Sequence, residues 1–315
     1  MASIIRSAVG SQCSVGFLSF LKSNGIKVTG TDITEDNVGR YFVDNYYKVP
    51  KASNEKRALE AYKCIIRKER ASCLISGPES EIILFSKYKN EFSRLGVDLF
   101  HPPYETLKII TDKWCAYNFF LDKKILMPVS SLLDRDLSVL DENIVLKPRK
   151  GRGSSGIKII DKQKIAKIDK SSLKDYFAQN FIKGEEFTVD FLCGYDGRIL
   201  NIVPRKRLVT DSGISIVSEI VIDAYLVDYV KKICSYLIFV GGNCAQFVKD
   251  KKGNYYLIDI NPRFGGGSIL SIMSSKDFQN NIISLLKKEY KKLIYGSESY
   301  EIKKMFRYYE EYYVN

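Results

Sequence analysis

Hydrophobic and polar positions in the N-terminal third of the chain predict alternating strands and helices. Apolar, β-branched runs predict strands at residues 3–9, 27–33, 71–76 and 97–100, and amphipathic stretches predict helices at residues 15–21, 54–69 and 82–95. This alternation is typical of a parallel sheet in an α/β domain, whose ligands bind at the carboxyl ends of the strands. The candidate contacts at those ends are Gly10, Ser11, Asp32, Glu79 and Glu81.

The pattern changes near Thr106, and strands dominate from there on. After a helix through Asp112, strands are predicted at residues 143–148, 157–161, 177–181, 186–193, 199–205 and 214–222. A helix over 224–239, a strand pair over 243–261 and helices over 269–290 follow. The Tyr- and Glu-rich residues 300–315 suit either a packed terminal helix or a loosely held tail. We therefore expect an α/β domain at 1–105, a strand-rich α+β domain at 106–290 and a terminal segment at 291–315.

The late strand pair brings oxygen-bearing side chains together. Lys251-Lys252-Gly253-Asn254 supplies a tight turn, so we expect residue 250 to face residue 255 and Gln246 to face Asp259. Asn261 lies two residues beyond Asp259 and shares its face, with Arg263 just after it. Oxygen ligands that include one carboxylate suit Mg²⁺. The same pattern also fits a surface hairpin whose polar face is hydrated.

Residues 151–156, Gly-Arg-Gly-Ser-Ser-Gly, form a glycine-rich loop with the spacing G-x-G-x-x-G. The next segment, Ile157–Ile160, is β-branched rather than helical, so a dinucleotide fold is not indicated, and the Gly-Lys-Ser/Thr of a Walker A loop is missing. A protein kinase is excluded because the chain has neither His-Arg-Asp nor Asp-Phe-Gly. The loop is expected to join two strands as a flap over phosphates, with positive charge from Lys147, Arg149, Lys150 and Arg152. An exposed Gly-Ser turn is the alternative.

Composition narrows the function classes. The net charge of +12, from 49 basic and 37 acidic residues, is spread along the chain, which favours an anionic ligand such as a nucleotide over specific nucleic-acid binding. A Ser-His-Asp triad or a multi-histidine zinc site would need His101, the single histidine, which lies in a loop-like Phe-His-Pro-Pro segment. We expect a cytoplasmic protein without membrane contact, because there is no membrane-length apolar run or signal peptide and the seven cysteines form no Cys-x-x-Cys pair.

Six segments between residues 106 and 275, in this order, resemble the ATP-grasp family. They are Asp112-Lys113, V-L-K-P-R-K-G-R-G-S-S-G at 145–156, Q-N-F-I-K-G-E-E-F-T-V-D at 179–190, V-P-R-K-R at 203–207, Gln246, and D-I-N-P-R-F-G-G-G at 259–267. The order is similar to that of standalone ligases related to the ATP-grasp module of the carbamoyl-phosphate synthase large subunit. The resemblance implies an N-terminal pre-ATP-grasp domain followed by an ATP-grasp fold, with the glycine flap in a lid subdomain at about 112–180.

The resemblance also implies roles for individual residues. The nucleotide would be contacted by Lys113, Lys147, the flap residues Gly151, Gly153, Ser154, Ser155 and Gly156, the backbone of Phe181 and Ile182, and Glu186 at the ribose. One or two Mg²⁺ ions, or Mn²⁺, would be held by Gln246, Asp259 and Asn261. Arg205 and Arg263 would face the γ-phosphate and the developing acyl phosphate. The chain departs from the family at Asp259, where glutamate is usual, and at Asn180, where glutamate is frequent.

These parts predict an ATP- and Mg²⁺-dependent ligase that activates a carboxylate as an acyl phosphate and joins it to an amine, releasing ADP and phosphate. A nucleotide-binding protein without catalysis, regulating or scaffolding a partner, is the alternative. The acid and the amine are not readable from the sequence. Their contacts are expected from the first domain and from loops such as Thr210–Ser215. The family suggests amino acids as candidate substrates, and a homodimer is compatible with it.

Overall fold

The computed structural model describes residues 2–11, 13–151, 156–168 and 173–314, and it contains three sheets. The first is parallel, with the strand order β3-β2-β1-β4-β5. Its strands are β1 (Ser3–Ser7), β2 (Lys27–Asp32), β3 (Asn45–Lys48), β4 (Cys73–Ile75) and β5 (Asp98–Leu99). The predicted parallel α/β layer is confirmed. Strand β3 was not predicted, because its four residues Asn-Tyr-Tyr-Lys show no apolar alternation.

Four helices and one short 3₁₀ helix accompany this sheet. They are α1 (Ser14–Ser23), α2 (Glu55–Glu69), α3 (Glu79–Lys87), α4 (Lys89–Arg94) and η1 (Val38–Phe42). Helix α2 buries one face, which includes Ala58, Tyr62 and Ile66, against the sheet. The single helix predicted over 82–95 is two helices, because the chain bends at Tyr88, which ends α3 and begins α4.

The second sheet is antiparallel, with the order β14-β13-β10-β11-β12-β15. Its strands are β10 (Glu185–Cys193), β11 (Ile199–Asp211), β12 (Ile214–Ile220), β13 (Gly241–Lys249), β14 (Tyr255–Asn261) and β15 (Lys304–Phe306). Helices α5 (Tyr104–Ile110), α6 (Lys113–Asp122) and α7 (Ala224–Cys234) share one core with this sheet. Helices α8 (Ser268–Ser274) and α9 (Lys276–Leu286) share another core with the sheet and with α1, which joins the first domain to the second sheet.

Alternation along β10 explains how both faces of the second sheet are covered. Phe187, Val189 and Phe191 point to the core that holds α5, α6 and α7. Leu192 belongs to the core on the opposite face, where α8 and α9 lie, and successive residues of a strand point to opposite faces. Thr188 and Asp190 therefore lie on the α8 side, although both are polar and fully buried. This face is the one that carries the functional residues described below.

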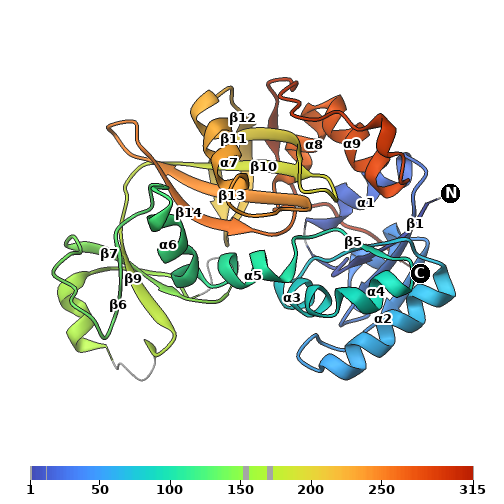
Figure 1. The fold of residues 1–315 in the computed structure, drawn as a ribbon, viewed down its shortest axis with the longest axis horizontal. Helices are drawn as coiled ribbons and strands as arrows, with labels where there is room; N and C mark the ends of the chain where they lie inside the picture. The colour runs from blue at the N-terminus through green and yellow to red at the C-terminus, as the bar shows by residue number, and fades with distance from the viewer. Residues whose placement is uncertain (1, 12, 152–155, 169–172, 315) are drawn as a thin grey trace.

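The third sheet is a small antiparallel one with the order β6-β9-β7-β8. It contains β6 (Ser130–Leu132), β7 (Asn143–Pro148), β8 (Lys158–Asp161) and β9 (Tyr176–Asn180), and the 3₁₀ helix η2 (Lys162–Lys167) follows β8. The glycine-rich loop joins β7 to β8, as expected for a flap between two strands. In Figure 1 this sheet and the parallel sheet lie on opposite sides beneath the antiparallel sheet.

The β13–β14 hairpin has the predicted strand pairing at one end but not next to its turn. Gln246 does face Asp259. Near the turn, however, Lys249 faces Tyr255, and the Asp250 N–H donates to the Asn254 carbonyl at 3.0 Å, so the predicted pairing of residues 250 and 255 is wrong. A bulge between Gln246 and Phe247 shifts the register by one residue, and the shift brings Gln246 opposite Asp259.

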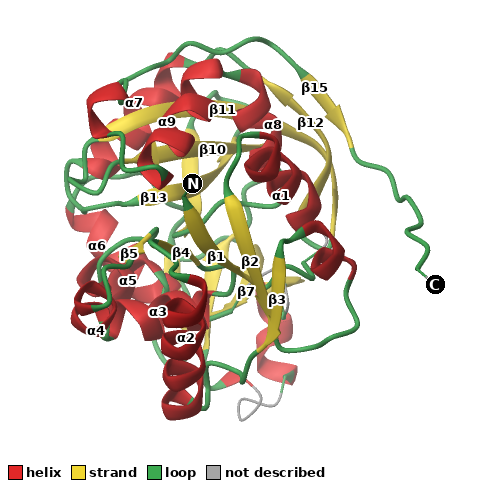
Figure 2. Ribbon diagram, turned by 90° about the vertical axis from the view of Figure 1, so that its right-hand side faces the viewer, coloured by secondary structure: helices red, strands yellow, loops and turns green. Residues whose placement is uncertain are grey.

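The described end of the chain does not form the packed terminal helix that was one of the two expectations for it. Its three-residue strand β15 pairs antiparallel with β12, at the edge of the large sheet. The remaining residues run out along one side of the molecule without a helix (Figure 2). Its contacts include hydrogen bonds from Arg307 Nη2 to the Gly266 carbonyl at 2.6 Å and from the Arg307 N–H to the Ile216 carbonyl at 2.9 Å, and stacking of the Tyr312 and Tyr41 rings. In the described ranges, no helix combines the length and apolar character that a membrane crossing requires.

Candidate functional site

A cavity of about 1020 Å³ lies where the three sheets meet, and most of the predicted site residues line it. Those that do are Lys113, Lys147, Gly151, Phe181, Ile182, Glu186, Gln246, Asp259, Asn261 and Arg263. Gly153, Ser154 and Ser155 lie outside the described residues, and Gly156 and Arg205 are not part of the cavity wall. Residues distant in sequence, from the first domain, the small sheet and the large sheet, are thus gathered around one space large enough for a nucleotide.

The three oxygen-bearing side chains predicted to hold a metal converge on one wall. Gln246 on β13 faces Asp259 on β14, and Asn261 Nδ2 donates a hydrogen bond to Asp259 Oδ2 at 3.1 Å. One carboxylate and two amide oxygens fit Mg²⁺, which takes few protein ligands and completes its shell with phosphate oxygens and water. Within the described ranges, His, Cys, Asp and Glu form no cluster of three that could bind a metal. The donor set therefore suits a hard cation shared with a ligand rather than a fully protein-bound metal.

Two lysines bring positive charge to the same wall. Lys147 on β7 is 8% exposed and donates from Nζ to Gln179 Oε1 at 2.7 Å. Burial lowers the pKa of Lys147 to about 8, the neighbouring Lys113 adds to this, and Asp259 opposes it. Lys113 lies at the start of α6, with its Nζ 2.9 Å from the Gly151 carbonyl and 3.9 Å from Asp259 Oδ1. A buried ammonium without a carboxylate in hydrogen-bonding contact is prepared to bind an anion.

Asp112 places Lys113 and the start of the flap, a role that sequence reasoning did not assign. Its carboxylate caps α6 by accepting from the N–H groups of Trp114 and Cys115. The same carboxylate pairs with Arg149 Nη2 at 2.7 Å, and the Lys113 N–H donates to the Arg149 carbonyl at 2.9 Å. Burial alone would raise the pKa of Asp112, but the Arg149 guanidinium and the two amides hold it below its ordinary value. Helix α6 and the strand before the glycine loop are therefore locked together.

The backbone between β9 and β10 is only partly available to a ligand. The Phe181 N–H already donates to the Asn143 carbonyl at 3.0 Å, so this residue keeps its carbonyl for an adenine contact. Asn180 is nearly buried, and its Oδ1 accepts from the Asp141 N–H at 2.9 Å. Asn180 therefore holds the loop before β7 and also lines the cavity. Glu186 reaches the cavity and pairs through Oε2 with Arg207 Nη1 at 2.9 Å.

The structure separates the two arginines of the Val-Pro-Arg-Lys-Arg motif. Arg205 is 3% exposed, with its Nε 2.7 Å from Asp190 Oδ2, so the expectation that it faces the γ-phosphate does not match its position behind the cavity wall. Arg207, two residues on and on the same face of β11, does line the cavity, and burial lowers its pKa. The Val-Pro-Arg-Lys-Arg motif contains Arg207 and could have indicated it as a site residue. The sequence does not show, however, which of the two arginines is covered by α8.

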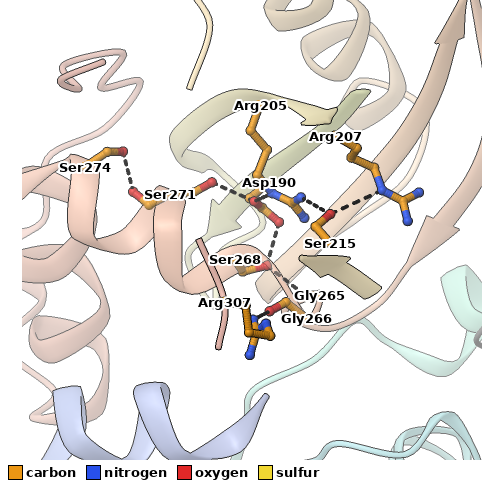
Figure 3. Close-up of polar contacts among 10 residues, drawn as sticks. All are labelled: Asp190, Arg205, Arg207, Ser215, Gly265, Gly266, Ser268, Ser271, Ser274 and Arg307. Atoms are coloured by element: carbon orange, nitrogen blue, oxygen red, sulfur yellow. Dashed lines mark hydrogen bonds and ion pairs between the residues drawn. The ribbon is translucent and has the colours of Figure 1, made fainter. Parts of the chain in front are cut away.

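Behind this wall a polar network holds the glycine-rich turn that precedes α8 (Figure 3). Asp190 accepts hydrogen bonds from the hydroxyls of Ser268 and Ser271 at 2.5 and 2.6 Å, and Ser268 Oγ accepts from the Gly265 N–H at 2.7 Å. A Cβ atom on Gly267 would come within 2.6 Å of Arg205 Nη1. Glycine is therefore needed where this turn crosses the Arg205 guanidinium.

The first domain contributes the remaining wall. Of the predicted contacts at its strand ends, Gly10, Ser11, Asp32 and Glu81 line the cavity, whereas Glu79 does not. Arg6 lines it as well and was not predicted, because it lies inside strand β1 rather than at the end. His101 is buried away from the cavity, with Nδ1 2.9 Å from Ser86 Oγ, and burial lowers its pKa to about 4. The histidine is accordingly a neutral core residue.

Comparisons with known proteins agree with this geometry. The family model described as ATP-grasp domain matches residues 110–267. Solved structures with a similar fold include N5-carboxyaminoimidazole synthetase from Staphylococcus aureus complexed with ADP, with a TM-score of 0.74 and 16% identity, covering 96% of this chain and 79% of that one. L-amino acid ligase from Bacillus licheniformis has a TM-score of 0.70 and 18% identity, covering 91% and 74%. Biotin carboxylase from Campylobacter jejuni has a TM-score of 0.69 and 16% identity, covering 90% and 70%. No match was found among curated proteins.

Proposed function

The chain belongs to the ATP-grasp family and is an enzyme of the ligase type, and from that premise we propose that it joins a carboxylate to an amine with ATP and Mg²⁺. The observation that carries the proposal is the convergence of Lys113, Lys147, Gln246, Asp259 and Asn261 on one cavity wall. Cations and oxygen ligands placed side by side suit a triphosphate with its metal. The flap strands β7 and β8 lie beside this wall, since Val145, Ile157 and Ile159 also line the cavity.

The nucleotide end of the cavity is assigned to the residues near the small sheet. Lys147 and Lys113 bind the phosphates, because both ammonium groups lie near Asp259 and neither is in hydrogen-bonding contact with a carboxylate of the described residues. Gln246, Asp259 and Asn261 hold Mg²⁺, which supplies charge neutralisation and orientation at the phosphates. The Phe181 carbonyl accepts from the adenine amino group, and Glu186 binds the ribose hydroxyls. Mn²⁺ satisfies the same oxygen ligands.

Two substitution steps account for the reaction. A substrate carboxylate oxygen attacks the γ-phosphorus of ATP, the bond to the β–γ bridging oxygen breaks, and ADP leaves. An amine nitrogen then attacks the acyl carbon, the carbon–oxygen bond breaks, inorganic phosphate leaves, and the nitrogen loses a proton to solvent. Arg207 and Arg263 neutralise the charge that develops on the phosphoryl and acyl oxygens, because both guanidiniums line the cavity. The chemistry requires orientation, charge and exclusion of water rather than histidine.

The proposal is tested by measuring ADP and phosphate release by the full chain with ATP, Mg²⁺ and mixtures of carboxylic acids and amines, including amino acids. Mass spectrometry then identifies the condensed product. Asn261→Ala serves as the inactive control, since it removes one metal ligand and leaves the strand pairing intact. Tight ATP binding without ADP release across the mixtures would instead favour a nucleotide-binding protein without catalysis.

A further inference from the structure

The first-domain end of the cavity carries a basic and an acidic side chain, Arg6 and Glu81, to which the proposed reaction assigns no role. Arg6 lies on β1 and Glu81 on α3, and Arg263, which follows β14, also lines the cavity. Figure 1 shows the parallel sheet on the opposite side of the molecule from the small sheet that carries Lys147. These charges therefore belong to the part of the cavity that is left for a second ligand.

The two arginines at this end are not neutralised by the protein. In the part of the chain that the structure describes, neither Arg6 nor Arg263 has a carboxylate at ion-pair distance, whereas Arg207, the other arginine lining the cavity, is paired with Glu186. Arg6 Nη1 donates to the carbonyls of Ser7 and Ile75, which fixes the guanidinium in place. Burial and, after it, the nearby Arg263 guanidinium lower the pKa of Arg6 to about 10. Two guanidiniums that repel one another across a cavity bind an anionic group placed between them.

Glu81 offers the opposite charge beside this anion site. It is 5% exposed, and Oε1 accepts a hydrogen bond from the Tyr62 hydroxyl, which is itself 2.9 Å from Thr31 Oγ1. Oε2 has no hydrogen-bond partner among the described residues, and the same holds for Arg6 Nε. Glu81 is close enough to Arg6 to raise the pKa of the arginine, yet no ion pair forms between them. Glu81 therefore lines the cavity without a basic side chain at ion-pair distance among the described residues.

We propose that Arg6, Arg263 and Glu81 form the subsite for an α-amino acid, with its carboxylate between the two guanidiniums and its ammonium group at Glu81. The inference rests on the proposed function and makes the amino acid the acid component of the ligase. Arg263 lies two residues after Asn261, so a carboxylate held there is on the phosphate side of the cavity. The ammonium is held at the far side, on the first domain.

The cavity lining next to these residues indicates which kind of side chain the substrate amino acid has. Phe17 on α1, Ile269 and Ile272 on α8, and Ile214 at the start of β12 all line the cavity. Apolar lining around a few ionised groups is typical of a site that orients a ligand by its charges and selects its side chain by burial. The expected substrate is therefore an amino acid with an apolar side chain.

The test is calorimetric titration of the full chain, saturated with MgADP, with L-leucine and two matched analogues. Isocaproate keeps the carboxylate and side chain of leucine but lacks the ammonium group, and isoamylamine lacks the carboxylate. Each analogue is expected to bind at least about tenfold more weakly than L-leucine, because a hydrogen bond to a charged group is lost. Valine, isoleucine, methionine and phenylalanine are titrated in parallel.

Variants of the chain test which residue binds the ammonium group of leucine and which bind its carboxylate. Glu81→Gln keeps the acceptor for Tyr62 and should weaken L-leucine about tenfold without changing isocaproate. Arg6→Gln should weaken L-leucine to the same degree without changing isoamylamine. Gly77→Ala should weaken L-leucine and isocaproate, since its Cβ atom would come within 2.9 Å of Arg6 Nη1. Glu60→Gln and Arg94→Gln, on exposed parts of α2 and α4, are the matched controls and should bind as the unmodified chain does.

The results that would overturn the amino-acid subsite differ from those that would contradict the proposed function. Failure of all five amino acids to bind, or equal affinities for L-leucine and isocaproate, overturns the subsite. Unchanged leucine affinity in both Glu81→Gln and Arg6→Gln overturns it too. MgADP affinity, measured in the same samples, reports the nucleotide end alone, so its loss contradicts the proposed function rather than the amino-acid subsite.

Discussion

Arg205 Nε donates a hydrogen bond to Asp190 Oδ2 at 2.7 Å, and both side chains are almost completely excluded from solvent. The pair joins neighbouring strands β11 and β10, and the carboxylate also accepts from two serines of α8. The ion pair therefore fixes the helix and the glycine turn onto the face of the sheet that carries Gln246 and Asp259. It supports the cavity wall from behind, and neither residue is part of that wall.

Asp190→Ala is expected to destabilise the fold by about 3–5 kcal/mol, because it leaves the Arg205 guanidinium buried without its carboxylate. Urea unfolding followed by circular dichroism measures the change. Glu298→Ala, which breaks the exposed pair with Lys231, is the matched control and should cost less than about 1 kcal/mol. Similar midpoints for the two variants would show that the Asp190 network contributes little.

Arg207→Ala is expected to lower kcat by about a hundredfold with little change in stability, because Arg207 lines the cavity and neutralises phosphoryl charge. Arg205→Ala should have the opposite pattern, in which the loss of stability is clear and is the main effect. Steady-state ADP release and thermal melting of both variants separate the two roles. A kcat that falls equally for both variants at equal stability would place Arg205 in the reaction as well.

The contrast between these two arginines shows what the sequence can predict about the site. The alternation along residues 199–207 places Arg205 and Arg207 on one face of a strand, and that much follows from local pattern. Which of them lines the cavity depends on α8, whose serines Ser268 and Ser271 reach Asp190 from more than seventy residues along the chain. Tertiary packing decided the difference, and no local signal reports it.

The elements of the fold also divide into those that the local sequence pattern predicts and those that depend on tertiary packing. Strands with strong alternation, such as β10, and helices with one apolar face, such as α2, were predicted within a few residues. Strands β3, β6 and β15 were missed because they have four, three and three residues and gain their stability from the neighbours β2, β9 and β12. The bulge at Gln246 and Phe247 was missed as well, although the Gln246–Asp259 pairing was correct.

Asp259→Ala and Asn261→Ala are each expected to abolish ADP release while the fold survives, because each removes an oxygen ligand from the proposed Mg²⁺ site. Asp259→Glu restores the residue that is usual in the family, and it should keep turnover and lower the Mg²⁺ concentration needed for half-maximal rate. The rate is measured as a function of Mg²⁺ concentration for all three. Near-normal rates in either alanine variant would remove these residues from the metal site.

Lys147 should make ATP affinity depend on pH. Its pKa in the folded protein is about 8, below the ordinary value of 10.5, so affinity is expected to fall as pH rises through about 8 and the ammonium loses its charge. The unfolded chain binds more protons than the folded one between these values, so this group also makes stability rise with pH there. Lys147→Met should bind ATP more weakly and lose the pH dependence in this window. Calorimetric titration across that range measures both effects, and an identical profile in the variant contradicts the assignment.

Arg307 gives the C-terminal segment a direct connection to the site. Its Nη2 donates to the Gly266 carbonyl at 2.6 Å, inside the turn that Asp190 and Ser268 hold from the other side, and its N–H donates to the Ile216 carbonyl. Arg307→Ala is expected to lower kcat several-fold with little change in ATP affinity, because the turn that follows Arg263 loses a hydrogen bond while the phosphate-binding lysines are untouched. Arg307→Lys should recover part of the rate. Lys303→Ala, which loses a bond to the Met273 carbonyl away from the cavity, is the control. Equal rates for the Arg307→Ala variant and the unmodified chain would show that Asp190 and Ser268 hold the turn without help from the C-terminal segment.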